Sequence, residues 1–533
     1  MLLQFTMHFT LEKMLKSTIS IFLALCFIFT GAAFAENVES SLDVGMVSTK
    51  TTQLLPLMPL ERDMVSIYNL VYESLMKIDD NRMPQPYLAK EYTVVNGGKT
   101  LKFELRENLR FSDGTPLTAY DIAASGNFIL ETAKNDGLED KGFYQNMRYL
   151  IKEFKAEDPM NLTVTTERAY YAALYSLTFP VVKADMVNTP NAVGSGPYVV
   201  QNFTPAQDIW LEVNPNWWQS EPQVKSIMIR FYSNNKDLIT DYEYGRIDTA
   251  VTRSVAAAQY KSGISSLSIS YRTNQLETLM LNHQSFPLGD VRVRKAILKA
   301  LDLRSLMSRA YMGMGIRAYT PFETGTWMYE DMESYYDYDL EGAKQLLAEA
   351  GWGDMDDNGT LDIINEKGET KNLVLRLAVY EDPINSVRYE IANSIKEMLA
   401  KVKISVNIQL TTMADLKPRL EAGSIDMAIV AFQMDVAPDP GFLLISSNVK
   451  NGNYSRYRSN QMDELFTAYR RKENPSEFAY AAKDIQRKFA EDIPFIPLFY
   501  ATGAILTRKM FTTVRDIREF EIFRGIESFS SVD

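Results

Sequence analysis

Hydrophobic positions in the second half of the chain recur with two different spacings. Over 340–350 the apolar residues fall on one helical face, Asp339 precedes them and Gly351 follows them. This arrangement predicts a helix, because an aspartate caps the first turn and glycine accepts the backbone conformation that ends it. A second helical pattern over 391–402 passes directly into apolar and polar alternation over 404–410, which predicts a helix followed by a strand.

The first half of the chain shows β and capping signals. Two strand-like stretches, 91–95 and 100–106, flank Asn-Gly-Gly-Lys at 96–99. Asparagine and glycine tolerate the positive φ of a tight turn, so this segment predicts a β-hairpin. Thr118, followed three residues later by Asp121, predicts the start of a helix that runs toward residue 132.

An almost continuous apolar run covers 425–432 and is interrupted only by Asp426. Such a run predicts a strand covered on both faces inside an α/β lobe. Ligands of open α/β sheets lie beyond the carboxyl ends of the strands. The residues that leave this strand, Gln433, Met434 and Asp435, are therefore predicted to lie near a binding crevice.

Residues 1–35 have the pattern of a secretory signal peptide. Two lysines, Lys13 and Lys16, precede the apolar stretch 19–29, and the small-residue site Ala-Phe-Ala at 33–35 follows. We expect cleavage before Glu36. The alternative is a membrane anchor, but the apolar stretch is short for a span that needs about 20 residues.

Basic charge directly before this apolar stretch indicates that translation starts at Met14. Residues 1–13 would then not belong to the natural protein. The chain has one cysteine, Cys26, which lies inside the signal segment. A cysteine that carries a lipid anchor follows a small residue, whereas Cys26 follows Leu25. We therefore expect no acylation. The mature chain would have no disulfide, thiolate metal site or cysteine nucleophile.

Length and charge narrow the class of protein. The chain has 533 residues, more than one hydrophobic core usually supports, so two or three lobes are expected. The formal net charge is −12, and no strong basic patch is visible. A nucleic-acid partner is therefore not expected.

Residues for catalysis are scarce. After signal cleavage His283 is the only histidine, and it follows an apolar strand-like stretch, so a structural role is expected. The sequence has no HExxH pair and no GxSxG elbow. Catalysis by two carboxylates remains an alternative, although no spacing singles out a pair. We expect a protein that is not an enzyme and that needs no cofactor.

The segment 354–359 resembles the opening of an EF-hand calcium loop. Oxygen-bearing side chains alternate, and Gly359 stands at the sixth position, but the twelfth residue is Asn365, which cannot supply a bidentate carboxylate. A turn rich in Asp and Asn is the preferred interpretation, and no metal site is predicted. Calcium-dependent melting would overturn that preference.

Several stretches, in order along the chain, resemble the family 5 extracellular solute-binding proteins, which include the oligopeptide, dipeptide and nickel-complex binders of ABC importers. The most specific is Phe-Ser-Asp-Gly-Thr-Pro-Leu-Thr-Ala-Tyr-Asp-Ile at 111–122. The others are Val-Tyr-Glu-Ser-Leu at 71–75, Pro-Tyr-Leu-Ala at 86–89, Phe-Glu-Leu-Arg at 103–106, Gly-Ser-Gly-Pro-Tyr at 194–198, Asn-Pro-Asn-Trp-Trp at 214–218, Asp-Val-Arg-Val-Arg-Lys-Ala at 290–296, Ala-Leu-Asp at 300–302 and Pro-Phe-Ile-Pro-Leu at 494–498.

This resemblance implies an α/β, two-lobed periplasmic-binding-protein-like fold, type II and similar to cluster C, with a two-segment hinge. The first lobe would span 36–272, with an inserted subdomain at roughly 75–185. The second lobe would span 273–492, and 493–533 would return to the first. The crossings would fall at roughly 271–276 and 490–500. Closure of such a hinge traps ligand between the lobes.

Peptide-binding relatives anchor the ligand's terminal ammonium on an aspartate after a strand of the second lobe, and Asp435 occupies a matching place. The loop is longer than the usual pattern and carries a second candidate, Asp439. Turn-forming residues are the alternative for both. Other candidate ligand contacts, which resemble cleft-facing segments of the family or follow the first apparent strand, are Asn453, Tyr454, Tyr457, Thr51, Thr52 and Gln53.

The predicted function is capture of a small solute, in the first place a short peptide, for delivery to the membrane permease of an ABC importer. An oligosaccharide, an opine-like metabolite or a metal chelate is the alternative cargo. A secreted hydrolase that uses two carboxylates is a distant alternative function. A monomer in the periplasmic space or at the cell-envelope exterior is expected.

Overall fold

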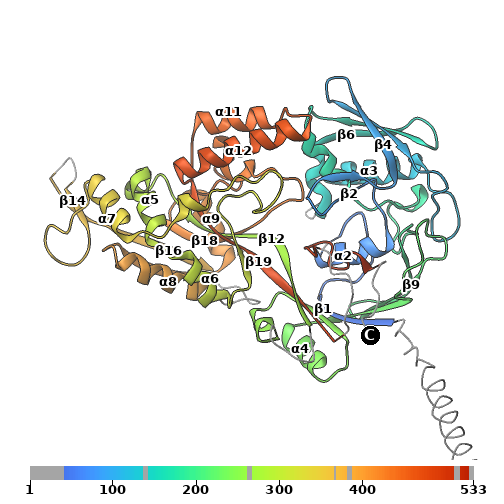
Figure 1. The fold of residues 1–533 in the computed structure, drawn as a ribbon, viewed down its shortest axis with the longest axis horizontal. Helices are drawn as coiled ribbons and strands as arrows, with labels where there is room; N and C mark the ends of the chain where they lie inside the picture. The colour runs from blue at the N-terminus through green and yellow to red at the C-terminus, as the bar shows by residue number, and fades with distance from the viewer. Residues whose placement is uncertain are drawn as a thin grey trace, which may run out of the picture.

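The computed structural model describes residues 41–59, 61–135, 138, 142–260, 267–364, 368–380, 387–508 and 516–526. Two α/β lobes lie side by side, and two long strands, β12 (Leu267–Leu281) and β19 (Phe495–Thr507), run between them (Figure 1). The predicted two-lobed α/β fold is confirmed. The expected signal segment, Met14 and Cys26 lie outside the described residues.

One eleven-stranded sheet is continuous through both lobes. Its strand order is β17 (Ser405–Thr411), β16 (Val374–Tyr380), β18 (Met427–Gln433), β12, β19, β11 (Thr249–Thr252), β1 (Ser41–Val47), β10 (Ser226–Tyr232), β9 (Asp208–Val213) and β8 (Tyr198–Thr204), and β13 (Gly315–Arg317) pairs with β19. The first lobe contains β1 and β8–β11, and the second contains β16–β18. Only β12 and β19 belong to both.

The pairing of β12 with β19 shifts register where the lobes meet. Arg272 faces Thr502 and Leu276 faces Tyr500, so three residues of β12 lie opposite Ala501 alone. An extra length of chain on one strand bends the pair and strengthens its twist. We propose that this bulge, at 272–276 and 500–502, is the hinge.

The first lobe carries a second sheet of four antiparallel strands. These are β4 (Ala89–Val95), β5 (Thr100–Leu105), β7 (Asn161–Thr166) and β6 (Ile151–Ala156), with helix α3 (Ala119–Lys134) packed against β6. The predicted hairpin is β4–β5, and its turn residues Asn96, Gly97 and Gly98 all have positive φ. The predicted helix is α3, which begins with a capping box formed by Thr118 and Asp121.

Motifs that are far apart in the sequence meet in this lobe. The buried Glu73 accepts hydrogen bonds from the indole N–H groups of Trp217 at 3.0 Å and Trp218 at 2.8 Å. A Cβ atom on Gly194 would lie 2.1 Å from the carbonyl oxygen of Val71. Glycine is therefore required where this segment crosses the end of helix α2 (Asp63–Val71).

Helices cover the sheet of the second lobe. They are α5 (Val291–Ala300), α6 (Leu303–Tyr311), α7 (Leu340–Glu349), α8 (Arg388–Ala400), α9 (Met413–Ala422), α10 (Gly441–Leu444), α11 (Asn460–Tyr469) and α12 (Pro475–Asp492). The first predicted helix is α7, where the Asp339 carboxylate accepts the backbone N–H of Gly342 at 2.8 Å. The predicted helix-to-strand unit is α8 followed by β17, and β16 lies parallel to both β17 and β18.

Smaller elements complete the chain. They are α4 (Asn235–Glu243), β2 (Met76–Ile78), β3 (Pro84–Pro86), β14 (Asp362–Ile364), β15 (Thr370–Asn372) and the 3-10 turns at Phe143–Tyr149, Tyr171–Leu177, Ala184–Met186, Val255–Tyr260, Phe286–Gly289, Glu333–Tyr336 and Ser446–Asn448. Among the described residues, no helix is long and apolar enough to cross a membrane.

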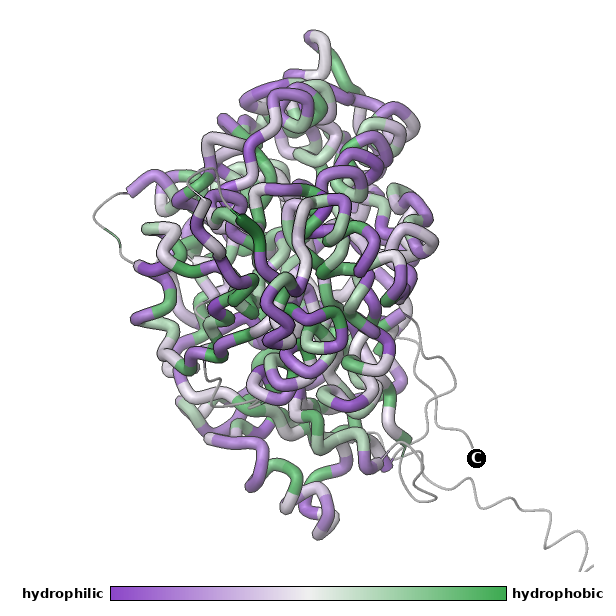
Figure 2. Tube along the Cα trace, turned by 90° about the vertical axis from the view of Figure 1, so that its left-hand side faces the viewer, coloured by the Kyte–Doolittle hydropathy of each residue, from purple (hydrophilic) through white to green (hydrophobic). Residues whose placement is uncertain are grey.

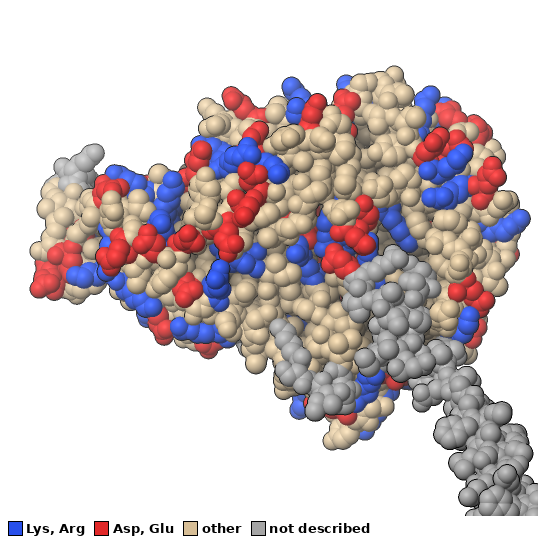
Figure 3. Space-filling view, viewed as in Figure 1, with Lys and Arg blue, Asp and Glu red and all other residues tan. Residues whose placement is uncertain are grey.

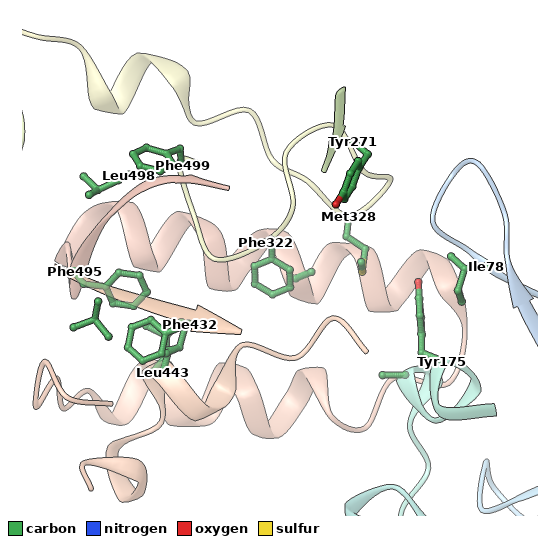
Figure 4. Packing of buried hydrophobic residues seen from close by; sticks show 14 of the residues in the cluster. Ile78, Tyr175, Tyr271, Phe322, Met328, Phe432, Leu443, Phe495, Leu498 and Phe499 are labelled. Carbon is green, nitrogen blue, oxygen red and sulfur yellow. The ribbon is translucent and has the colours of Figure 1, made fainter. Parts of the chain in front are cut away.

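The core runs through the lobes with the sheet. Apolar positions lie inside the body, while polar positions dominate many outer turns (Figure 2). Phe432, at the end of β18, clusters with Leu443 and Phe495 (Figure 4). Nearly every residue of β19 is buried. His283 has the structural role predicted for it: its Nε2 is 2.9 Å from the Pro494 carbonyl oxygen, and burial lowers the pKa of the ring to about 3.

Candidate binding cleft

A cavity of about 460 Å³ lies where the two lobes and the hinge meet. The first lobe contributes parts of 65–87, Phe143 and Tyr144, and the segment 518–526 after β19. The second lobe contributes parts of 321–328 and the loop 434–440. The bulge residues Arg272, Thr273 and Asn274 lie between these walls. The volume is within the range of small-ligand sites.

The sheet places the loop 434–440 at the cavity. Strand β18 is paired with the parallel strand β16 on one side and with β12 on the other, and the loop leaves its carboxyl end. The backbone N–H of Met434 donates to the carbonyl oxygen of Asn274 at 2.8 Å. The start of the loop is therefore bound directly to the hinge bulge.

Asp435 presents a solvent-accessible carboxylate inside the cavity. Its Oδ2 accepts a hydrogen bond of 2.8 Å from the side-chain amide of Asn146, which belongs to the first lobe. Among the described residues, no lysine or arginine forms an ion pair with it. Although the carboxylate is open to the cavity, the protein packed around it displaces much of its bulk water, and this desolvation raises the pKa of the carboxyl above its ordinary value. Hydrogen bonds from Asn146 and nearby backbone N–H groups oppose that shift.

Asp439 is in a different environment. Its carboxylate accepts two hydrogen bonds from Arg470, at 2.7 and 2.9 Å, one from the Tyr170 hydroxyl at 2.8 Å and one from the Gly441 N–H at 2.9 Å. A carboxylate offers about four acceptor positions, so this group is fully engaged. Because Tyr170 belongs to the first lobe, Asp439 also connects the two walls of the cleft.

A second connection between the lobes centres on Glu519, which is 5% exposed. Its carboxylate pairs with Arg62 at 2.6 Å and with Arg253 at 2.9 Å, and it accepts the backbone N–H of Asn274 at 2.5 Å. Arg62 also donates to the side chain of Gln433, which belongs to the second lobe. Glu519 therefore ties the first lobe to both the hinge and the end of β18.

The arginines that line the cavity are neutralised by neighbouring acids. Arg272 and Arg82 pair with Glu323, and Arg518 and Arg524 pair with Glu521. Arg82 also pairs with Asp516, and Arg524 with Asp80, so four carboxylates face the four guanidinium groups. These four cations are consequently committed to the protein's own carboxylates.

Aromatic residues supply much of the remaining wall. Phe143 packs edge-on against Phe520, with ring centroids 4.7 Å apart, and the Arg62 guanidinium lies 5.3 Å from the Phe520 ring. Tyr144 lies beside them, and its buried hydroxyl has no hydrogen-bond partner in the part of the chain that the structure describes.

Of the residues predicted from sequence, Asp435 and Asp439 line the cavity. The amide of Asn453 donates to the Ile445 and Tyr457 carbonyl oxygens at 3.1 and 2.8 Å. The hydroxyl of Tyr457 donates to Asp492 at 2.5 Å, and Tyr454 stacks on Phe432.

Like Asn453, Tyr454 and Tyr457, the residues predicted for the opposite wall lie outside the lining of this cavity. Thr51 is buried, and its hydroxyl donates to Glu61 at 2.8 Å, whereas Thr52 and Gln53 are exposed. Ligand contacts by these three residues, and by Asn453, Tyr454 and Tyr457, remain predictions.

Two parts of the cleft were missed from sequence: Asn146, and the segment 518–526. The alternation of opposite charges over 515–524 was a signal for the segment 518–526, because charged side chains that become buried need partners of opposite charge.

A cavity between two lobes whose described strands have just β12 and β19 in common defines this molecule as a hinged binding protein. The chain belongs to the bacterial extracellular solute-binding proteins, family 5, whose middle-region model matches residues 83–454.

Its relatives carry different cargo. It is 25% identical over 458 residues to the oligopeptide-binding protein AppA of Bacillus subtilis, covering 81% of each chain. The solved structure of that protein in complex with a nonapeptide covers 92% of this chain and 99% of its own, with a TM-score of 0.66 and 21% identity. NikA from Brucella suis in complex with Fe(III)-EDTA covers 92% and 100%, with a TM-score of 0.76 and 18% identity.

Proposed function

We propose that this protein captures a short peptide in the cleft between its lobes and delivers it, chemically unchanged, to the permease of an ABC importer. It would act as a monomer outside the cytoplasmic membrane. The observation that carries the proposal is Asp435, a carboxylate inside the cavity whose only side-chain donor among the described residues is the neutral Asn146.

Asp435, and not Asp439, is the proposed anchor for the terminal ammonium of the peptide. An ammonium must find free acceptor positions and uncompensated negative charge, because burying either charge alone is costly. Arg470, Tyr170 and Gly441 already occupy the Asp439 oxygens. Asp435 has free acceptor capacity and, within the described ranges, no cation paired with it, so an ammonium would complete its environment.

The same charge argument disfavours the alternative cargo. A carboxylate-rich chelate would need a free cation, and the four arginines of the cavity wall are paired with four carboxylates of the protein, those of Glu323, Glu521, Asp516 and Asp80. A neutral oligosaccharide would leave Asp435 without a counter-charge. Both remain possible outcomes of the experiment below.

Capture is proposed to work by closure of the hinge. A ligand favours the closed form only if it binds that form more tightly than the open one. Asp435 comes from the second lobe, whereas Asn146 and the aromatic wall residue Phe143 come from the first. A ligand that contacts both walls therefore gains contacts on closure, and the closed shape is what the permease would recognise.

Native mass spectrometry of protein purified without refolding would identify cargo that co-purifies, and thermal melting with di- to pentapeptides would measure binding. A raised Tm with peptides, and recovery of intact peptide after release, are expected. No response to any peptide pool would refute peptide binding, and a co-purified sugar or chelate would replace the cargo. Recovery of a converted product would refute passive capture.

A further inference from the structure

A second site lies in the second lobe, at the end remote from the cleft. The loop that precedes β14, together with Asp362 at the start of that strand, brings one carboxylate oxygen from each of Asp354, Asp356 and Asp362 within 4.8 Å of one another. Figure 1 places β14 at the left-hand tip of the molecule, and acidic atoms gather at that tip in Figure 3. We propose that this loop binds a calcium ion.

Asp362 supplies the observation that points to a ligand. Its side chain is 0% exposed, and its Oδ2 accepts the Met355 N–H at 2.9 Å. Its Oδ1 is buried and has no hydrogen-bond partner among the described residues. Burying an unpaired carboxylate oxygen is strongly unfavourable, so a cation at the convergence of the three carboxylates would satisfy it.

The loop has the spacing of a calcium-binding loop. Counted from Asp354, oxygen-bearing side chains occupy the first, third and fifth positions, and Asp362 is the ninth. The sixth is Gly359, which has a φ of +84° and directs its N–H to the Asp354 carboxylate at 3.2 Å. Glycine at this place allows the sharp turn that points alternate side chains inward.

The preferred sequence interpretation, a turn rich in Asp and Asn, accounts for only part of this geometry. Such turns are present, because the Asn358 side chain accepts the Thr360 N–H at 2.8 Å. They leave Asp362 Oδ1 unsatisfied. The three converging groups are all carboxylates, and the Asn358 amide, which now donates to Asp356 at 2.8 Å, would have to turn its oxygen inward to join them. Hard oxygen ligands in a flexible loop suit calcium, with water completing the shell.

One cation already stands at the edge of the site. The Lys403 ammonium lies 2.6 Å from Asp354 Oδ2 and remains half exposed. Its single charge offsets one of the three carboxylates, so the cluster keeps a net negative charge. Calcium would compete with it, and affinity should fall in the weak class of about 10⁻⁴–10⁻³ M that suits an extracellular protein.

Terbium luminescence tests the site directly, because Trp352 lies two residues before Asp354 and can sensitise a bound lanthanide. We expect saturable luminescence that calcium displaces. We also expect a Tm several degrees higher in about 5 mM calcium than in equal magnesium, reversed by chelation. Asp356→Asn, at an exposed position, should remove both effects without unfolding the protein, and Asp337→Asn, another exposed aspartate, should change neither.

Two further variants separate a metal site from a structural turn. Asp362→Asn should abolish terbium binding while raising the Tm of the calcium-free protein, because an amide carries no charge to bury. Lys403→Gln should tighten terbium binding severalfold by removing the competing cation. Equal Tm in calcium and magnesium, or luminescence that persists in Asp356→Asn, would overturn the proposal.

Discussion

Replacing Asp435 by asparagine tests the proposed anchor while preserving its shape. Truncating one partner of a buried, hydrogen-bonded charge pair costs about 2–5 kcal/mol. Because the carboxylate is accessible to solvent in the ligand-free cavity, we expect the lower part of that range, about 2–3 kcal/mol, which corresponds to about a 30- to 150-fold rise in Kd. Titration calorimetry with a peptide of established affinity measures this change.

Acetylation of the peptide's terminal amine supplies the matched chemical control. The acetylated peptide should bind the unmodified protein about as weakly as the free peptide binds Asp435→Asn, and the variant should not distinguish the two peptides. Asp439→Asn should instead lower stability, since it weakens the contacts to Arg470 and Tyr170. A variant Kd within twofold of the original, or a variant that still discriminates against acetylation, would refute the assignment.

The same group predicts the pH dependence of binding. Because the pKa of Asp435 is raised in the ligand-free protein, folding disfavours its ionised form relative to the unfolded chain, so its charge lowers stability as pH rises above the unfolded pKa. The ligand-free Asp435→Asn protein should consequently be at least as stable as the original at neutral pH. Peptide affinity should be constant above the raised pKa and fall as pH drops through it, whereas the variant should show a flat profile.

Three predictions concern stability. Arg388→Met leaves the buried Glu277 carboxylate without its partner at 2.6 Å and should cost about 3–5 kcal/mol of unfolding free energy in urea titrations; a loss below about 1 kcal/mol would contradict the buried pair. Gly194→Ala forces a methyl group against the Val71 carbonyl, so a cost of about 1–3 kcal/mol and a lower Tm are expected, and an unchanged Tm would count against that packing. Burial alone would raise the pKa of Glu521, but the charges of Arg518 and Arg524 outweigh burial and lower the pKa. The ionised Glu521 side chain therefore stabilises the fold fully above its unfolded-state pKa. This stabilisation is lost as pH falls through the lower pKa of the folded state. The Tm difference between the original and Glu521→Gln should therefore shrink in acid, and a constant difference would refute this.

The local pattern of the sequence was sufficient to predict those helices, strands and turns that are determined by residues close together in the chain. The face of α7 and its Asp339 cap, the change of period from α8 to β17, and the turn between β4 and β5 all depend on interactions within a few positions. The continuous apolar run of β18 also predicted correctly that the loop beginning at Met434 would reach the cavity, because parallel topology directs such loops to one edge.

Tertiary structure decided which charges are free. Asp435 and Asp439 are four positions apart and look equivalent in sequence, but Arg470 and Tyr170 engage only the second. The sequence around Asp362 likewise did not indicate that one carboxylate oxygen of this residue would be buried without a partner among the described residues. Backbone conformation follows from neighbours along the chain, whereas the compensation of a charge depends on groups that only folding brings together, and that compensation determines where a ligand can bind.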